Sequence, residues 1–214
     1  MMLALLVVTA FSAGGWAAHQ RQETVRAAEQ RKALQALQLR REAGWNKLKR
    51  NLNMEIRSFN GQAGVVVEDL RTGRVLAHQP SRSFPAASVI KVPMMTACFQ
   101  AATEGKLDLN SNVVVRPADK VSGSGVLKTM PGRSQVRVSK LIDWMITQSD
   151  NTATNVLMSR LGMNYYNRHF QQMGLSGTRL ARPMMDFSQR KKGVENTTTA
   201  QDMAQVLRKL YRAE

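Results

Sequence analysis

Cysteine is nearly absent from this chain of 214 residues, in which Cys98 is the only one. No internal disulfide can form, which excludes a disulfide-stapled scaffold. Cys98 lies in an apolar segment that predicts a helix, so we expect a buried structural thiol. The three histidines, His19, His78 and His169, lack metal-ligand spacing, and there is no Walker loop, GxSxG elbow or HExxH motif. We therefore expect no metal and no cofactor.

Acidic residues are also scarce: 15 Asp and Glu stand against 31 Lys and Arg, for a formal net charge of +16. Such an excess can mark a face that binds nucleic acid. Here the basic residues are spread along the chain, as at Arg21, Lys49 and Lys192, and only three Trp and three Tyr are available to stack on bases. This argues against a nucleic-acid partner. Attraction to anionic lipid or cell-wall polymer explains the same surplus.

Charge is missing altogether from Leu3–Ala18, which is mostly apolar. The run is short for a membrane span of about 20 residues. It predicts a signal peptide or membrane anchor over residues 1–18, which would export the protein to the periplasm or another extracytoplasmic place and allow membrane association through residues 3–18. No Lys or Arg precedes the run and several follow it, against the usual orientation bias. A mis-set start codon or a partial N-terminus therefore stays an alternative.

The remaining chain predicts one globular domain behind a helical extension. Residues 19–43, rich in Ala, Gln, Glu and Arg, predict a solvated helical stalk that ends near Gly44. The domain spans residues 44–214 and starts with a second helix. A hairpin follows, with strands near 64–70 and 75–78 around a glycine turn. Further elements are a short extended segment at 113–115 and helices at 88–104, 138–147, 152–161, 165–173 and 199–211.

The first chemical motif is Ser88-Val89-Ile90-Lys91, at the predicted start of a helix. Residues three apart share a helix face, and a serine nucleophile needs a neighbouring base. Lys91 can be that base only if burial or nearby positive charge lowers its pKa from about 10.4. A capping serine with a surface lysine produces the same spacing. The apolar residues that follow Lys91 favour a buried helix instead.

The second motif, Ser149-Asp150-Asn151, lies where one predicted helix ends and the next begins. All three residue types favour helix N-caps, so the motif alone is explained as a cap. Together with Ser88 and Lys91, the motif can be interpreted as part of a catalytic site. Ser149 could relay a proton between Lys91 and a leaving group, and Asn151 could hold a substrate amide through its two-sided side chain.

The stretch from Trp45 to Tyr211 resembles the N-terminal two-thirds of a class A β-lactamase or a close relative in the penicillin-binding superfamily. The matching segments are Val66–Asp69 with Thr72-Gly73, Phe84–Lys91, Gly123–Leu127, Met145–Asn155 and Asn196–Thr199. The resemblance implies an α+β fold of the β-lactamase/transpeptidase type, with a helical subdomain packed on an antiparallel sheet that is incomplete in this chain. It also implies a small-molecule substrate, either a β-lactam or a peptidoglycan peptide.

The resemblance assigns a role to each residue of the two motifs. Ser88 would be the acylated nucleophile, Lys91 the general base or its partner, Ser149 the proton shuttle and Asn151 the substrate-amide ligand.

Two departures from the family pattern limit what the resemblance implies. In these β-lactamases a Glu activates the deacylating water, and an ungapped alignment places Met184 at its position. Asp186 is a candidate substitute, although a loop or surface carboxylate is the simpler interpretation. The family's third motif, Lys-Thr/Ser-Gly on a later strand, does not occur before Glu214. Lys191-Lys192-Gly193 is expected in a polar loop, so the chain is expected to be C-terminally truncated.

These features predict a serine hydrolase of the class A β-lactamase-like group. It would form an acyl-enzyme with β-lactams or D-alanyl peptides and would be weak or incomplete in deacylation. The alternative is a non-catalytic, membrane-tethered envelope protein, a truncated pseudoenzyme in which the fold survives without turnover.

Overall fold

The computed structural model describes residues 13–213, with the side chains of residue 16 and of residues 19 onward. Its contacts divide the chain into two units, Met1–Gly61 and Gln62–Glu214. Most of the predicted signal or anchor segment lies outside the described residues. Among the helices of the described part, none is both long enough and apolar enough to cross a membrane.

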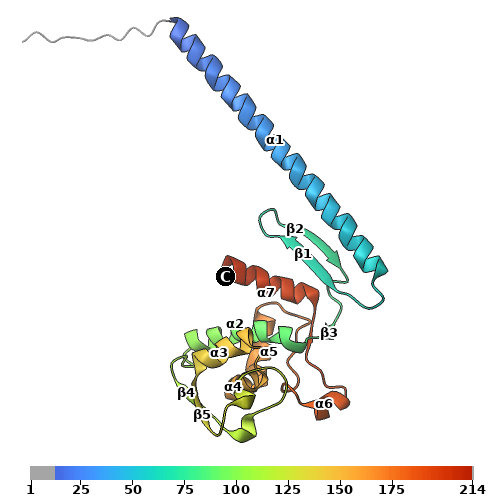
Figure 1. The fold of residues 1–214 in the computed structure, drawn as a ribbon, viewed down its shortest axis with the longest axis vertical. Coiled ribbons are helices and arrows are strands. Elements are labelled where there is room, and N and C mark those ends of the chain that lie inside the picture. Colours follow the sequence, from blue (N-terminus) through green and yellow to red (C-terminus); the bar gives the residue numbers. More distant parts are fainter. Residues whose placement is uncertain (1–12, 214) are drawn as a thin grey trace, which may run out of the picture. The chain divides into compact units, whose positions relative to one another are not determined.

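The first unit consists of helix α1, Ala13–Ser58, which Figure 1 shows as one unbroken helix. Its 46 residues give a length of about 70 Å. The predicted break at Gly44 is wrong. A single glycine costs a helix interior only about 1 kcal/mol relative to alanine, and the Ala-, Glu-, Lys- and Arg-rich sequence on both sides offsets that cost.

The second unit begins with an antiparallel hairpin of β1, Val65–Asp69, and β2, Arg74–His78. Val67 pairs with Leu76 in this register. Gly73 has a φ of +72°, which a side chain would disfavour at this tight turn. The hairpin predicted from the sequence is confirmed.

Two smaller antiparallel pairs complete the β-structure. β4, Asn112–Val115, pairs with β5, Ser134–Arg137. β3, Phe84–Pro85, pairs with β6, Thr197–Thr198. The three pairs are separate two-stranded sheets. Because β3 ends at Pro85, shortly before Ser88 in sequence, its pairing with the distant β6 anchors the segment that leads to Ser88.

Six helices follow the hairpin in the described chain, and five of them match predicted ones. They are α2 (Lys91–Thr103), α3 (Val138–Thr147), α4 (Asn151–Leu161), α5 (Met163–Gln172), α6 (Phe187–Lys191) and α7 (Ala200–Arg212). The sequence predicted a polar loop where α6 forms. Lys191 is the last residue of this short helix and does not lie on a strand.

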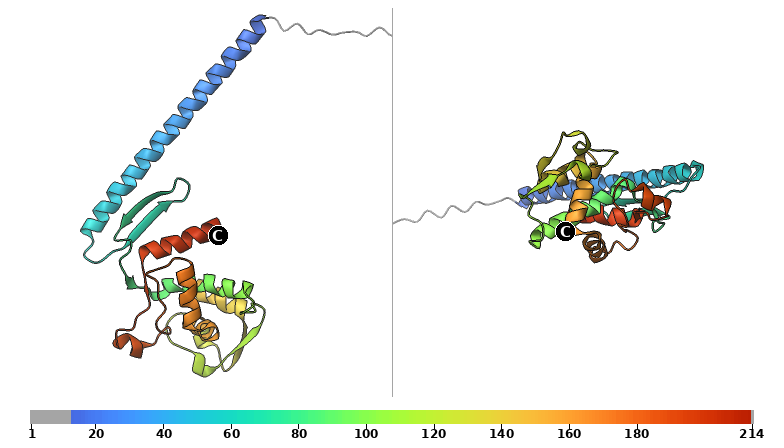
Figure 2. Two further views of the ribbon diagram at one scale, coloured as in Figure 1. Left: turned by 180° about the vertical axis from the view of Figure 1, so that it is seen from behind. Right: turned by 90° about the horizontal axis from the view of Figure 1, so that it is seen from below.

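Helices α2 to α5 enclose the core of the second unit. α2 lies beside α3 and α5, and α4 contacts both α3 and α5, an arrangement that can be followed in Figures 1 and 2. The facing side chains include Met94, Leu141, Leu157 and Phe170, each fully or almost fully buried. Burying a side chain of this size stabilises a fold by about 1.5–3 kcal/mol. The packing therefore holds the start of α2 next to the turn between α3 and α4.

Helix α7 packs against β1. A partly buried ion pair joins the two, with Arg208 Nε 2.8 Å from Glu68 Oε2. At the other end of the helix, the Thr199 side chain accepts a hydrogen bond from the backbone N–H of Asp202 and caps it. The fold thus combines a helical body with small antiparallel sheets, the α+β class that the sequence predicted.

Candidate active site

Ser88 and Lys91 lie at the junction between a 3-10 turn, Ala87–Ile90, and α2. Ser88 is within the turn, and Lys91 is the first residue of α2. Ala87 has a φ of +44°, an uncommon conformation for a residue with a side chain. The sequence predicted one helix from Ser88 onward, and the tighter turn at its start accounts for the difference.

The Lys91 ammonium is buried, with 2% of the residue exposed. Its Nζ donates to Ser149 O at 2.6 Å, to Ser149 Oγ at 3.0 Å and to Asn151 Oδ1 at 2.8 Å. These bonds use all three protons of the charged form. The two motifs, some sixty residues apart in sequence, therefore meet at a single nitrogen.

Burial lowers the pKa of Lys91 to about 8, and the negative charge of Asp150 opposes that shift. Burial has this effect because it disfavours the charged form of a lysine. A substantial fraction of the Lys91 side chains is then neutral near pH 8, whereas an exposed lysine would be almost fully charged at that pH. Lys91 can act as a base only if its pKa is lowered, and burial lowers it.

Ser149 links the lysine to Ser88. Ser149 Oγ accepts from Lys91 Nζ and donates to Ser88 Oγ at 3.0 Å. Ser149 has a φ of +50°, a left-handed conformation that is unfavourable for a non-glycine residue. The surrounding turn holds it there, because Asp150 N and Gln148 N both donate to Trp144 O, at 3.0 and 3.1 Å. The strained residue is therefore the one that connects the two motifs.

Asp150 holds the turn from within. Only 1% of it is exposed, and its carboxylate accepts from Ala153 N and from Leu127 N, both at 2.9 Å. The first of these bonds caps α4, as the sequence suggested for this motif. The second ties the α3–α4 turn to the loop that contains Gly125. Sequence patterns could not identify this second bond, because it joins segments 23 residues apart.

Asn151 is 7% exposed and is held at three points. Its Oδ1 accepts from Lys91, its Nδ2 donates to Ser122 O at 3.2 Å, and its backbone N–H donates to Ser124 O at 3.1 Å. A carboxamide has two donor hydrogens and two acceptor lone pairs. These contacts use one donor and one acceptor of the Asn151 side chain.

Met184 is the residue that the ungapped alignment predicts at the position of the water-activating Glu. It is 8% exposed, and its backbone is bound by the side chain of Asn155. Asp186 has a separate role: its Oδ1 accepts from Ser188 Oγ at 2.7 Å and from Gln189 N at 3.1 Å, which caps α6. The carboxylate considered as a substitute for the water-activating Glu thus caps a helix.

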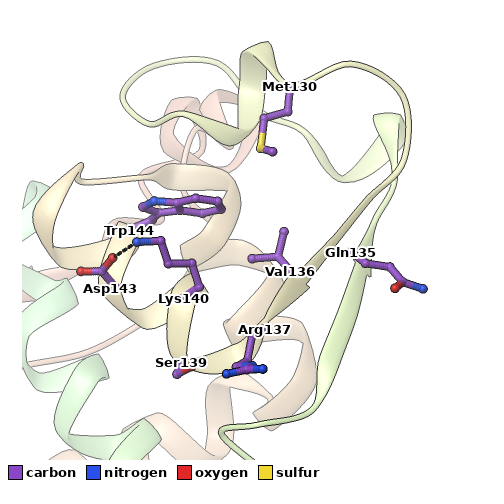
Figure 3. Close-up of a pocket in the computed structure, with 8 residues that line it drawn as sticks. All are labelled: Met130, Gln135, Val136, Arg137, Ser139, Lys140, Asp143 and Trp144. Atoms are coloured by element: carbon purple, nitrogen blue, oxygen red, sulfur yellow. Dashed lines mark hydrogen bonds and ion pairs between the residues drawn. The ribbon is translucent and has the colours of Figure 1, made fainter.

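A hollow of about 520 Å³ lies beside α3, shown in Figure 3. Its lining residues are Met130, Gln135, Val136, Arg137, Ser139, Lys140, Asp143 and Trp144. Lys140 Nζ lies 2.6 Å from Asp143 Oδ2 and 5.3 Å from the centre of the Trp144 ring, so this cation is already paired. The hollow is lined by none of the four residues Ser88, Lys91, Ser149 and Asn151, which together form the Ser88 cluster. Among the residues that the structure describes, no group of three or more His, Cys, Asp or Glu side chains could hold a metal ion.

The Ser88 cluster on this α+β scaffold defines a protein of the class A β-lactamase and penicillin-binding type. The sequence model of the Beta-lactamase enzyme family matches residues 47–214, and the chain belongs to that family. Beta-lactamase CARB-3 of Pseudomonas aeruginosa is 31% identical over 155 residues, which is 72% of this chain and 54% of that enzyme. Beta-lactamase ROB-1 of Haemophilus influenzae is 30% identical over 154 residues, 71% of this chain and 49% of that enzyme. The chain thus spans about half the length of these relatives.

Solved structures show the same fold. PBP-A has a TM-score of 0.71 at 32% identity, over 78% of this chain and 62% of its own. A point mutant of PBP-A, described as an acyl-enzyme complex with penicillin G, has a TM-score of 0.70 at 33% identity, over 79% of this chain and 63% of its own. A beta-lactamase from Sphaerobacter thermophilus has a TM-score of 0.66 at 30% identity, over 72% of this chain and 58% of its own. The fold class predicted from the sequence is confirmed.

Proposed function

We propose that this chain carries the acylation site of a serine enzyme that reacts with β-lactams or with the D-alanyl peptides they mimic. One observation carries the proposal: the continuous hydrogen-bonded chain from Lys91 Nζ through Ser149 Oγ to Ser88 Oγ, with both links at 3.0 Å. It supplies a nucleophile, a relay and a base whose pKa is lowered to about 8.

In the proposed reaction, Ser88 Oγ attacks the carbonyl carbon of the substrate and the bond from that carbon to nitrogen breaks. Neutral Lys91 receives the Ser88 proton by way of the Ser149 hydroxyl, and Lys91 then passes a proton back through Ser149 to the leaving nitrogen. The product is an ester between Ser88 and the acyl group. Asn151, with one donor and one acceptor unused, would bind the amide of the acyl group.

The second half of the cycle is proposed to be slow. Hydrolysis of the ester needs a base for the attacking water, and the side chain of Met184 cannot accept a proton from water. Asp186, the nearest acidic alternative in the sequence, caps α6 through two hydrogen bonds. An acyl-enzyme that persists follows from these two facts. The names of the relatives support a β-lactam substrate, since they are beta-lactamases and one solved neighbour is an acyl-enzyme with penicillin G.

We also propose that the protein acts outside the cytoplasm, as the apolar run Leu3–Ala18 predicts. D-alanyl peptides of the cell wall are located there. Fractionation of cells that express the full chain would test this, and recovery in the cytoplasm alone would contradict it.

The test of function is covalent labelling by a fluorescent penicillin. We expect a labelled band for the full chain, an adduct on Ser88 by peptide mass spectrometry, and no label on Ser88→Ala. Ser139→Ala, at an exposed serine of α3, is the matched control and should label normally. A chain that takes no label, or a Ser88→Ala variant that labels like the parent, would instead favour the non-catalytic envelope protein.

A further inference from the structure

A further cavity, of about 500 Å³, lies between helices α2, α5 and α7. Its lining includes Thr96, Phe99, His169, Met173, Lys209 and Leu210, and none of the residues of the Ser88 cluster. Volumes of about 300–1,000 Å³ are typical of sites for small molecules. No sequence motif pointed to this place, because the lining residues come from three helices that are distant in the sequence. The cavity is therefore a candidate ligand site separate from the Ser88 cluster.

Contacts between α2 and α5 form the buried side of this cavity. Thr96 Oγ1 lies 3.1 Å from His169 Nε2 and 3.3 Å from Met173 Sδ. His169 is 9% exposed, and burial lowers the pKa of its imidazole, a shift that the charge of Glu104 opposes. The imidazole is therefore neutral at pH 7. Gln205 of α7 donates to Met173 O, just after α5, so all three helices are joined before a ligand binds.

Helix α7 supplies the charge of the cavity. Lys209 lies in its last turn, and within the described part of the chain no residue forms an ion pair or hydrogen bond with its ammonium group. The acidic residue at the end of α2, Glu104, is already engaged, because Lys106 Nζ lies 2.6 Å from its Oε2 and Tyr165 also donates to it. Lys209 is therefore a cation with which an anionic ligand could pair.

Phe99 of α2 and Leu210 of α7 form the apolar part of the lining. They are 48% and 43% exposed, large fractions for side chains of this kind. Exposed apolar side chains grouped beside polar ones are typical of ligand-binding surfaces. The hollow beside α3 in Figure 3 also combines a lysine with an aromatic ring, but Lys140 is paired there with Asp143. The cavity between α2, α5 and α7 thus differs in having both an apolar surface and an uncompensated cation.

We propose that this cavity binds a small organic carboxylate with an aromatic or alkyl body. The carboxylate would pair with Lys209, and the apolar body would cover Phe99 and Leu210. Both parts are needed, because an ion pair that is open to water contributes little by itself, whereas apolar surface removed from water drives binding. The inference goes beyond the proposed acylation at Ser88, and neither depends on the other.

Calorimetric titration of the full chain with 4-phenylbutyrate tests the proposal, with 4-phenyl-1-butanol as the uncharged ligand of similar size. We expect the carboxylate to bind about three- to fivefold more tightly than the alcohol. Lys209→Gln should remove this preference. Lys140→Gln, at the lysine that is already paired with Asp143, is the matched control and should keep it. Equal affinities in the parent chain, or a preference that survives Lys209→Gln, would overturn the proposal.

The apolar part of the site is tested with two exposed leucines of α7. Leu210→Asn should weaken both ligands about three- to fivefold, because part of the apolar contact is lost. Leu207→Asn, on the same helix but outside the cavity lining, should weaken neither. Both side chains are exposed, so neither change should unfold the chain. Equal losses in the two variants, or no loss in Leu210→Asn, would contradict the proposed seat of the apolar body.

The imidazole NMR signals locate the bound ligand. The His169 signal should shift when 4-phenylbutyrate is added, whereas those of His19 and His78, which do not line the cavity, should stay in place. Ser88→Ala should bind 4-phenylbutyrate like the parent chain, which separates this site from the acylation site. An unmoved His169 signal, or binding that is lost in Ser88→Ala, would place the ligand elsewhere and overturn the proposal, while leaving the proposed function untouched.

Discussion

Asn155 binds the main chain of Met184 at both of its polar groups: Nδ2 donates to Met184 O at 3.0 Å, and Oδ1 accepts from Met184 N at 2.8 Å. The position of residue 184 is therefore set through its backbone. A different side chain can be placed there without moving the main chain, which makes the residue a suitable site for testing the deacylation step.

Met184→Glu should shorten the lifetime of the acyl-enzyme. A carboxylate at this position would supply the missing base for water, and general-base catalysis contributes about 10²–10⁴-fold in rate. We expect a gain toward the lower end, about 10²-fold, because the rest of the loop is adapted to methionine. The decay of a penicillin adduct on Ser88, followed by intact-protein mass spectrometry, measures it. Met184→Gln, equal in size but not basic, is the control, and equal decay in the two variants would contradict the prediction.

Asp186→Asn should leave the acyl-enzyme lifetime within about twofold of the parent. Asparagine caps a helix nearly as well as aspartate, so α6 and the thermal unfolding midpoint should be preserved. The same mass-spectrometric decay is measured. Accumulation of acyl-enzyme in this variant, above the level of the parent, would show that Asp186 replaces the family Glu after all.

The acylation rate should rise with pH through about 8. Neutral Lys91 is the proposed base, and burial lowers its pKa to about 8, so its active form becomes dominant above that pH. Lys91→Arg, which stays charged at every accessible pH, should lose at least about 10²-fold in acylation rate. Stopped-flow acylation between pH 6 and 9.5 provides the profile. A flat profile for the parent chain would exclude Lys91 as the titrating base.

The same pKa affects stability, in a different pH window. The unfolded chain holds the Lys91 proton up to about pH 10.4, whereas the folded chain releases it near pH 8. Between these values the unfolded state binds more protons, so the free energy of unfolding contributed by this group increases with pH. Below pH 8 the destabilisation is fully present. Lys91→Met should lack this increase in urea titrations at pH 7.5, 9 and 10, and a parallel increase in both proteins would contradict the assignment.

Gly125→Ala should destabilise the fold by more than about 2 kcal/mol. Its φ is +121°, and an added Cβ would lie 2.2 Å from Asp150 Cγ and 2.6 Å from Asp150 Cα. Because the second of these is a backbone atom, the clash cannot be relieved by a side-chain rotation. Gly132→Ala, at φ +55° with open space around it, should cost only about 1 kcal/mol. Urea unfolding measures both, and equal losses would show that Asp150 moves freely.

Sequence patterns predicted the regular elements well where their periodicity was local. α3 matches its predicted range of 138–147, and the hairpin of β1 and β2 forms as expected. β3 and β6 escaped prediction, because a two-residue pairing has no periodicity and depends on segments more than a hundred residues apart. The break at Gly44 failed for the opposite reason: a local preference was outweighed by its helix-forming neighbours.

In the site too, features with a local sequence pattern were predicted and features that depend on distant segments were not. Spacing identified Ser88, Lys91, Ser149 and Asn151, and the structure brings their side chains into one hydrogen-bonded cluster. A residue that supports the cluster, Asp150, acts through a side chain to backbone bond across the tertiary fold, in which its carboxylate accepts from Leu127 N. Such bonds cannot be predicted from the pattern of residues along the sequence, because they join segments that are distant in it. The catalytic roles of the four residues remain predictions for the experiments above.

The lone cysteine has a practical consequence. Cys98 is fully buried, and burial raises the pKa of its thiol to about 11. Electrophilic reagents that react with thiolates should therefore not modify Cys98 in the folded chain near neutral pH. A cysteine introduced at an exposed position would then be the single labelling site, so a spectroscopic probe could be placed on this chain without first removing a native residue from its core.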